Sequence, residues 1–364
     1  MISFGPSEEQ ELVRDAMREF AADAIRPIAR ACDEASEIPQ DFLETAWSLG
    51  LTSTQIPEAY GGAGEARSLV TNAILVEELA VGDATLAIAA VAPSLFANAI
   101  LDQGTEAQKQ ALLPRFCGET FATGALAVVE PGALADASRP RTVAEAKGTA
   151  FVLSGQKTAV VMGDRASHFL VTARVGDDFG AFVVPRDAAG VVVGEQEKRM
   201  GLRALPSTSL ALERVEVGPE ALLGGASGAD VQQLLNGSRT ALAAVMLGLS
   251  RAVLEYCVPY SKDRVAFDEP IAKKQSIAFR LADMHIEQHA LRQLVWQAAS
   301  LLEHGEDATR AAFLARSYAA EKSMWIADNG VQVLGGHGFI REHPVEMWFR
   351  NARTLGVLEG VVGL

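Results

Sequence analysis

The spacing of the hydrophobic residues changes twice along the chain, and this change limits the possible folds most strongly. Up to about residue 120 the apolar residues recur at helical spacing, starting with a capping box in which Gln10 follows Ser7 by three residues. From Ala122 to Val217 the apolar runs are short and are separated by Gly, Pro and Asp, as in a small antiparallel β-barrel. From about Ala229 long helical patterns return.

We therefore predict an α+β fold in three parts: an N-terminal helical domain over 1–120, a central small antiparallel β-barrel over 121–226 and a C-terminal four-helix bundle over 227–364. We expect Arg26-Pro27 to end the first helix, because proline disrupts a helix interior. The N-terminal domain is predicted to continue with a helix over 42–49 and with helical runs over 67–116 that break near Asp83 and at Gly104-Thr105. The predicted strands are 123–129, 150–153, 169–175, 181–184, 191–193 and 209–217, and the plainest later helices are 234–258, 274–304 and 307–334.

The composition excludes several classes of function. The net charge of −14 would repel nucleic acids and anionic membranes. No run reaches the roughly 18 to 20 uninterrupted apolar residues of a membrane span, and the first six residues lack the features of a signal peptide. The three cysteines are far apart, and His285 and His289 do not form a zinc-protease pattern, so no disulfide or metal site is predicted. We expect a cytoplasmic protein.

Several motifs follow one another in a recognisable order. Together they resemble the acyl-CoA dehydrogenase family over essentially the whole chain. The family's activity would make the protein an oxidoreductase in which FAD takes a hydride from the β-carbon of an acyl-CoA thioester while a carboxylate removes the α-proton. The resemblance also implies an electron-accepting flavoprotein as partner, and a homo- or hetero-oligomeric dimer or tetramer. The motifs are Ile56–Gly62, Gly104–Lys109, Met200–Arg203, Arg264–Phe267 with Gln275, and Gln332–Gly338.

Glu359-Gly360 occupies the place of the family's catalytic base. The alternative is a surface carboxylate, against which the apolar neighbours Leu358 and Val361 argue. Some members of the family carry the base just before an arginine in the C-terminal domain, where this chain has Ser238. Glu359 is therefore the candidate base. The following Arg239 would either brace the substrate pocket or cap a helix turn.

The resemblance implies a flavin site shared by two chains, and the half given to the neighbouring chain looks complete. An arginine suits a pyrophosphate, an aromatic ring can pack beside adenosine, and paired glycines permit close approach of the backbone. Taken singly, the same residues could form a surface salt bridge and an ordinary helix-ending turn. The candidate FAD-binding residues are Arg264, Phe267, Gln275, Gln332, Gly335 and Gly336.

The half that would hold the flavin ring in the chain's own site departs from the family pattern. The family's polar and indole contacts are replaced, mostly by apolar residues, at Val129, Ala133–Asp136, Ala159, Val161, Met162, Leu205, Val361 and Gly363. Each lost hydrogen bond would weaken flavin binding by roughly 1 kcal/mol. Three hypotheses follow: a catalytic dehydrogenase with unusual flavin contacts, a subunit that completes the flavin site of a sister chain, and a catalytically silent scaffold. We favour the second.

Overall fold

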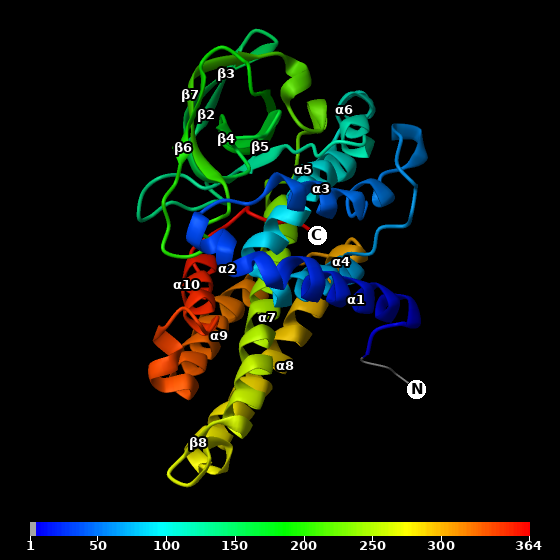
Figure 1. Ribbon diagram of the computed structural model, residues 1–364. Helices are drawn as coiled ribbons and strands as arrows, with labels where there is room; N and C mark the ends of the chain where they lie inside the picture. The colour runs from blue at the N-terminus through cyan, green and yellow to red at the C-terminus, as the bar shows by residue number, and fades with distance from the viewer. Residues whose placement is uncertain (1–4) are drawn as a thin grey trace.

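The computed structural model describes residues 5–364, so the opening residues Met1–Phe4 lie outside the described part. The N-terminal part is helical and wraps around one side of the molecule (Figure 1). Its α-helices are α1 (Glu8–Phe20), α2 (Arg26–Ala35), α3 (Gln40–Ser48), α4 (Leu69–Gly82), α5 (Ala84–Gln103) and α6 (Glu106–Leu112).

The predicted capping box is confirmed at the start of α1. The Ser7 hydroxyl accepts from the backbone N–H of Gln10 at 3.2 Å, and the Gln10 side chain accepts from the backbone N–H of Ser7 at 2.9 Å. The expected stop at Arg26-Pro27 is wrong. A π-helical turn over Ala21–Ile25 leads directly into α2, and Pro27 sits in the first turn of that helix, where its missing N–H breaks no intrahelical hydrogen bond.

The break near Asp83 is also present, and Asp83 itself forms it. Its carboxylate accepts from the backbone N–H groups of Thr85 at 2.9 Å and Leu86 at 3.0 Å. It is thus the N-cap of α5, a helix that is buried over most of its length.

The middle part is a seven-stranded sheet, and its topology corrects the expected antiparallel barrel. The strands are β1 (Ala125–Ala127), β2 (Val143–Lys147), β3 (Ala150–Val161), β4 (His168–Val175), β5 (Asp178–Pro185), β6 (Val191–Gln196) and β7 (Ser207–Val217). Their order is β1-β4-β2-β3-β7-β6, with β5 paired to β4. The sheet is mixed, because β4 runs parallel to both β1 and β2. The pairing of its described strands does not close on itself, since β6 and β1 end the path.

An ion pair is buried inside this sheet. The Lys157 ammonium lies 2.9 Å from the Glu130 carboxylate, which also accepts from the hydroxyl and the backbone N–H of Thr142. Burial would raise the pKa of Glu130, but the hydrogen bonds from Thr142 and the charge of Lys157 outweigh it and lower the pKa to about 2. Burial lowers the pKa of Lys157 to about 8, against the opposing effect of Glu130.

This pair predicts a loss of stability in acid. Because the pKa of Glu130 is lower in the folded chain than its ordinary 4.5, its contribution is complete above about pH 4.5 and is lost as the pH falls toward 2. Wild type should therefore lose about 2 to 3 kcal/mol more across this range than a Glu130→Gln/Lys157→Met variant, which lacks both charges. Urea unfolding at several pH values measures this difference. Glu145→Gln, at an exposed position of β2, should keep the wild-type slope, and an equal slope in the double variant would refute the prediction.

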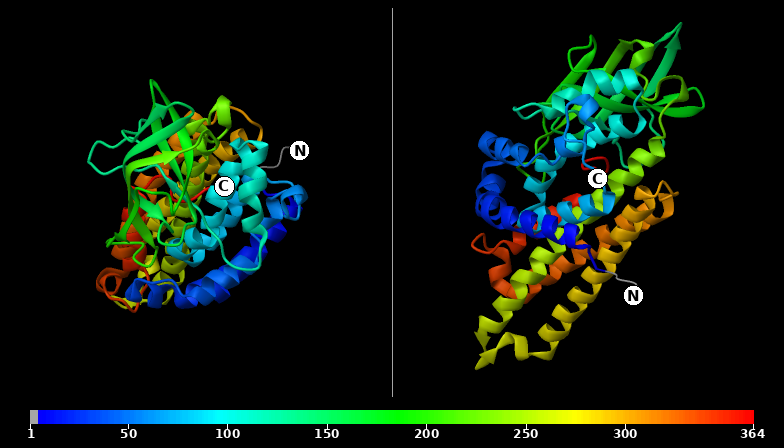
Figure 2. Two further views of the ribbon diagram at one scale, coloured as in Figure 1. Left: turned by 90° about the horizontal axis from the view of Figure 1, so that it is seen from above. Right: turned by 90° about the vertical axis from the view of Figure 1, so that its right-hand side faces the viewer.

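The C-terminal part contains α7 (Val231–Asp263), α8 (Gln275–Glu303), α9 (Thr309–Leu334) and the shorter α10 (Val345–Leu355). The predicted bundle is confirmed. Figure 2 shows that the ends of α7 and α8 project beyond every other element, on the side of the molecule opposite the sheet. A short hairpin of β8 (Val265–Ala266) and β9 (Glu269–Pro270) joins these two helices.

A buried charge cluster ties α4 to α7 and α8. One guanidinium nitrogen of Arg251 lies 2.8 Å from Glu77 and 2.6 Å from Glu78, and Arg292 lies 2.7 Å from Glu77. Both carboxylates are almost fully buried, so their charges depend on these partners.

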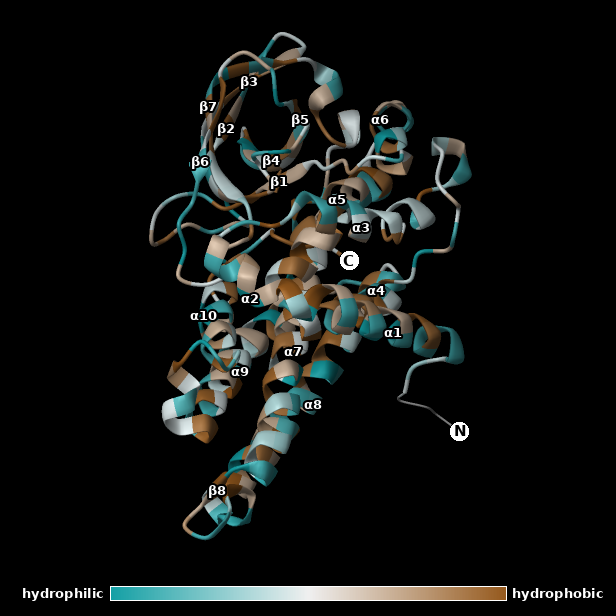
Figure 3. Ribbon diagram, viewed as in Figure 1, coloured by the Kyte–Doolittle hydropathy of each residue, from teal (hydrophilic) through white to brown (hydrophobic). Residues whose placement is uncertain are grey.

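The helices α5 and α7 are long and apolar enough to resemble membrane spans, yet most of each is packed inside the protein. Figure 3 shows the hydrophobic colour concentrated where α4, α5 and α7 meet in the middle of the molecule. Core helices of this kind pass the same test, so they are weak evidence for a membrane. The cytoplasmic location stays a prediction.

Candidate functional site

The residues expected to hold a neighbour's flavin gather at the projecting end of the helical bundle. Arg264 follows α7 directly, Phe267 is in the β8–β9 turn, and Gln275 opens α8 (Figure 1). All three side chains are exposed. We call this segment, residues 264–275, the arm.

The turn of the arm has an unusual backbone. Phe267 and Asp268 both have positive φ angles, 55° and 67°, which is the conformation of a type I′ hairpin turn. A bulky side chain seldom adopts such angles, because its Cβ crowds the backbone. Phe267 is nevertheless 89% exposed, and the Lys274 ammonium lies 5.9 Å from the centre of its ring. A strained and exposed aromatic residue indicates a functional contact outside this chain.

The remaining candidate residues lie at the same end of the bundle. Gln332 is exposed on the last turn of α9, and Gly335 and Gly336 follow it. A side-chain carbon added at either glycine would meet nothing within 4 Å, so this backbone is open to another molecule. The Tyr260 hydroxyl, one turn before Arg264, hydrogen-bonds to His337 Nδ1 at 2.8 Å and links the glycine turn to the arm.

Glu359 and Arg239, the candidate base and substrate residue, are in direct contact. Arg239 Nε donates to both carboxylate oxygens of Glu359, at 3.3 and 3.2 Å. The Glu359 side chain is 25% exposed. It is therefore neither a fully exposed surface carboxylate nor the fully buried one that its apolar neighbours had led us to expect. In this conformation Arg239 forms an ion pair with the candidate base, and the roles of both residues stay predictions.

Arg316 holds the turn that carries Glu359, and sequence reasoning missed it. From α9 its buried guanidinium donates to the carbonyl oxygens of Gly356 at 3.0 Å and Leu358 at 2.8 Å. Burial lowers the pKa of Arg316, with the charges of Glu359 and Arg239 acting in opposite directions. An arginine among the apolar positions of α9 was the available signal, but nothing local identified its carbonyl partners about 40 residues away.

Five of the positions that would line the chain's own flavin ring are buried, whereas Ala133–Asp136, assigned to the same half, are exposed. Ala159, Val161 and Met162 at the end of β3 are 7%, 4% and 0% exposed, and Leu205 and Val361 are 1% and 0% exposed. All five belong to one hydrophobic core cluster. These side chains are thus covered by other apolar residues of that cluster. At these five positions the ring half therefore leaves no open space for a flavin in this conformation, whereas the arm and the glycine turn are exposed to solvent.

A partly buried carboxylate also contacts the end of β3. Glu197, after β6, accepts from the backbone N–H of Ala159 at 3.0 Å and from the hydroxyl of Thr158. Burial would raise the pKa of Glu197, but the hydrogen bond from Thr158 and its other contacts outweigh it and lower the pKa. The carboxylate thus stays charged and holds the end of β3 in place.

Comparison with known families agrees with this architecture. The acyl-CoA dehydrogenase N-terminal, middle and C-terminal domain models match residues 7–120, 125–215 and 227–362. An acyl-CoA dehydrogenase of Bacillus subtilis is 34% identical over 97% of this chain and 95% of its own length. The chain belongs to the acyl-CoA dehydrogenase family, whose members are oxidoreductases that act on CH–CH bonds.

Two solved structures extend the comparison. Butyryl-CoA dehydrogenase from Megasphaera elsdenii superimposes with a TM-score of 0.89 at 32% identity, covering 99% of this chain and 96% of that one. A glutaryl-CoA dehydrogenase from Mycobacterium smegmatis, solved in complex with FADH2, gives a TM-score of 0.87 at 25% identity, with 98% and 92% coverage. A flavin cofactor is typical of the family.

Proposed function

We propose that this chain is one subunit of a hetero-oligomeric acyl-CoA dehydrogenase and that it completes the FAD site of a sister chain. The observation that carries the proposal is the contrast between the two halves of its flavin residues. The half directed at a neighbour is exposed, whereas the ring half is buried among apolar side chains at Ala159–Met162, Leu205 and Val361 and is exposed only at Ala133–Asp136.

The arm has the chemistry to hold the outer part of FAD. Arg264 supplies a permanent charge for the pyrophosphate, and the side-chain amides of Gln275 and Gln332 supply donors and acceptors. Phe267 offers a flat apolar surface for the adenosine, and Gly335 with Gly336 lets the dinucleotide approach the backbone. When bound in the sister chain, the flavin accepts the hydride removed from the acyl-CoA.

In this proposal Glu359 does not act as the catalytic base of the assembled enzyme. Its carboxylate faces Arg239 rather than an open ring site, and Arg316 fixes the turn on which it lies. The substrate acyl-CoA and the electron-accepting flavoprotein would therefore act at the sister chain's flavin.

The proposal is tested by the flavin content of the purified protein. We expect the chain alone to be colourless. Its complex with a sister acyl-CoA dehydrogenase chain from the same source should absorb at about 450 nm, as bound flavins do. Co-expression of the two chains followed by absorbance and mass measurement gives the flavin per complex. In that complex Glu359→Gln should leave turnover unchanged.

Three results would count against the proposal. Stoichiometric FAD in the lone chain would show that its own ring site opens, and would favour a catalytic dehydrogenase with unusual contacts. A large loss of turnover in Glu359→Gln, with the flavin content kept, would place Glu359 in the reaction. A complex with no flavin in either chain would favour the silent scaffold.

A further inference from the structure

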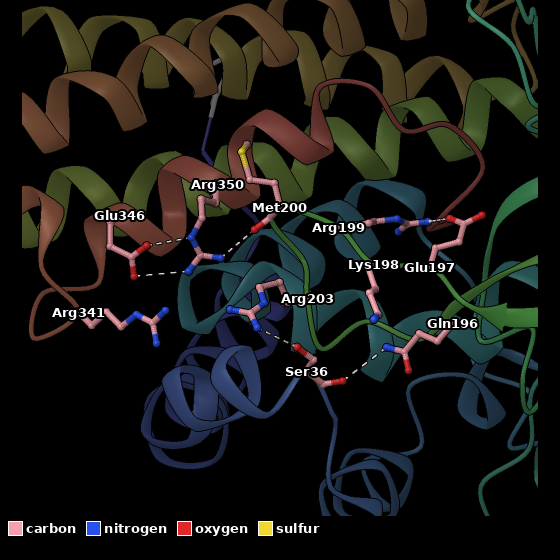
Figure 4. A pocket seen from close by; sticks show the side chains of 10 residues that line it. All are labelled: Ser36, Gln196, Glu197, Lys198, Arg199, Met200, Arg203, Arg341, Glu346 and Arg350. Carbon is pink, nitrogen blue, oxygen red and sulfur yellow. Dashed lines mark hydrogen bonds and ion pairs between the residues drawn. The ribbon is translucent and has the colours of Figure 1, made fainter.

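A cavity of about 720 Å³ lies where the three parts of the chain meet, and Figure 4 shows the side chains around it. Ser36, at the end of α2, borders it from the N-terminal part. Residues 196–200 and Arg203, which connect β6 to β7, form a second wall. The third wall comes from Arg341 and from α10. Neither the arm residues nor Glu359 line it, and Glu197 is the residue that it shares with the surroundings of β3 described above.

The cavity is strongly basic in a chain whose net charge is −14. Basic side chains outnumber acidic ones in its wall, and such a local concentration of positive charge attracts anions. The basic residues are Lys198, Arg199, Arg203, Arg341 and Arg350, and the acidic residues are Glu197 and Glu346.

Both carboxylates in the wall already have partners. Glu197 accepts from Ala159 and from Arg199 Nη2, the latter at 2.7 Å. Glu346 accepts from Arg350 Nε at 2.9 Å. Neither acid is left to neutralise the other basic groups of the cavity.

Three cations therefore remain available to a ligand. Lys198 is exposed and has no hydrogen-bond or ion-pair partner among residues 5–364. Arg203 donates to the neutral Ser36 hydroxyl at 3.2 Å, and Arg341 makes only a long, exposed contact of 3.5 Å with Glu34 within the described chain. In Figure 4 the Lys198 and Arg203 side chains extend toward the Ser36 turn, and Arg341 lies on the α10 side.

Arg199 adds a second, independent indication of an anion site. Its side chain is only 10% exposed, and one of its guanidinium nitrogens, Nη1, is buried without a hydrogen-bond partner in the described structure. A buried donor without a partner is costly in a folded protein, and a hydrogen bond to a bound anion would satisfy it.

We propose that this cavity binds the diphosphate group of a nucleotide. Guanidinium groups bind phosphate oxygens through paired, charge-assisted hydrogen bonds, and three cations around one cavity match the charge of a diphosphate. The volume is in the range of small-molecule sites. Ser36 and Gln196 provide neutral hydrogen-bonding groups for the sugar or base. The diphosphate could belong to a free nucleotide or to the ADP part of a larger coenzyme such as CoA.

Calorimetric titration of the full chain with ADP tests the proposal at low ionic strength. We expect one ADP per chain, and we expect Lys198→Ala and Arg341→Ala each to weaken ADP roughly tenfold, because each removes a charged contact. Both positions are exposed, so the variants should fold, which their circular dichroism and melting temperatures verify. Lys147→Ala removes the same charge from an exposed ion pair with Glu216, outside the cavity, and should bind ADP as wild type does.

A parallel titration with CoA separates the two sources of the diphosphate. Tighter binding of CoA than of ADP, lost in the same two variants, would assign the site to the ADP part of the coenzyme, and equal affinities would assign it to a free nucleotide. The proposal is overturned if ADP does not saturate the chain by about 1 mM. It is also overturned if sulfate competes as well as ADP, or if Lys147→Ala weakens ADP as much as Lys198→Ala does.

Discussion

Replacing Arg264 by alanine is expected to empty the flavin site of the assembled enzyme. The arginine is exposed at the start of the arm, and its side chain has no partner within the described chain, so the substitution removes a ligand contact without disturbing the fold. Loss of a charge-assisted contact to a pyrophosphate costs about 1.5 to 3 kcal/mol, which corresponds to roughly 10- to 150-fold weaker FAD. Titration of the flavin-free complex with FAD, followed by flavin fluorescence, measures the change.

A matched variant separates this contact from a general effect of charge. Arg310 is another exposed arginine, at the start of α9 and outside the arm, and Arg310→Ala should bind FAD as tightly as the wild-type complex. The assembly state of both complexes is checked by their sedimentation. Unchanged FAD affinity in an intact Arg264→Ala complex would remove the arm from the flavin site.

Removing Arg251 is expected to produce a large loss of stability. Arg251→Met keeps the volume of the side chain but leaves the buried carboxylates of Glu77 and Glu78 without their shared partner. Breaking a buried ion pair from one side costs about 3 to 5 kcal/mol, because the remaining charge stays out of water. Urea unfolding followed by circular dichroism gives the change in the free energy of unfolding.

The same cluster supplies the controls for this experiment. Arg18 also contacts Glu78, at 3.3 Å, but its side chain is 52% exposed, so Arg18→Met should cost less than about 1 kcal/mol. Adding Glu77→Gln and Glu78→Gln to Arg251→Met should restore much of the lost stability, because no uncompensated charge then remains buried. A mild effect of Arg251→Met alone would mean that water or Arg292 can replace its charge.

Much of the helical architecture could be predicted from the sequence because its signals are local. The capping box at Ser7 and the helix break near Asp83 both depend on residues no more than three positions apart, and the structure contains both. Pro27 shows the limit of such reasoning. A proline can either end a helix or stand in the first turn of the next one. Here the π-helical turn over Ala21–Ile25 leads directly into α2, so Pro27 stands in a first turn.

The sheet was harder to predict because strand pairing is not local. The strand β2 has the sequence Val-Ala-Glu-Ala-Lys and buries only Ala144, so it has little hydrophobic signal of its own. Its parallel pairing with β4 joins Val143 to Arg174, about 30 residues apart. No motif within either strand specifies that direction.

The features of the candidate site also divide into local ones, which the sequence could predict, and contacts between distant residues, which it could not. The arm residues are close in sequence, and the structure places them at one end of the bundle with Gln332 and the glycine turn. The contact between Arg239 and Glu359 joins residues 120 positions apart, and the closed packing of Ala159 and Val361 depends on the whole core. Substitutions in the sequence indicated that polar contacts were missing, but only the structure shows apolar side chains filling the space.

The projecting arm also has a consequence for how this protein would behave at low concentration. In the proposed complex the residues that contact the outer part of FAD belong to one subunit and the ring site belongs to another. The affinity for FAD then depends on the concentration of the subunits, because only the associated subunits form the complete site. Dilution that separates the chains would release flavin even though every contact within each chain survives. Because the hairpin that carries Phe267 would contact the flavin of another subunit, the flavin absorbance of a solution would report how much of the complex is assembled.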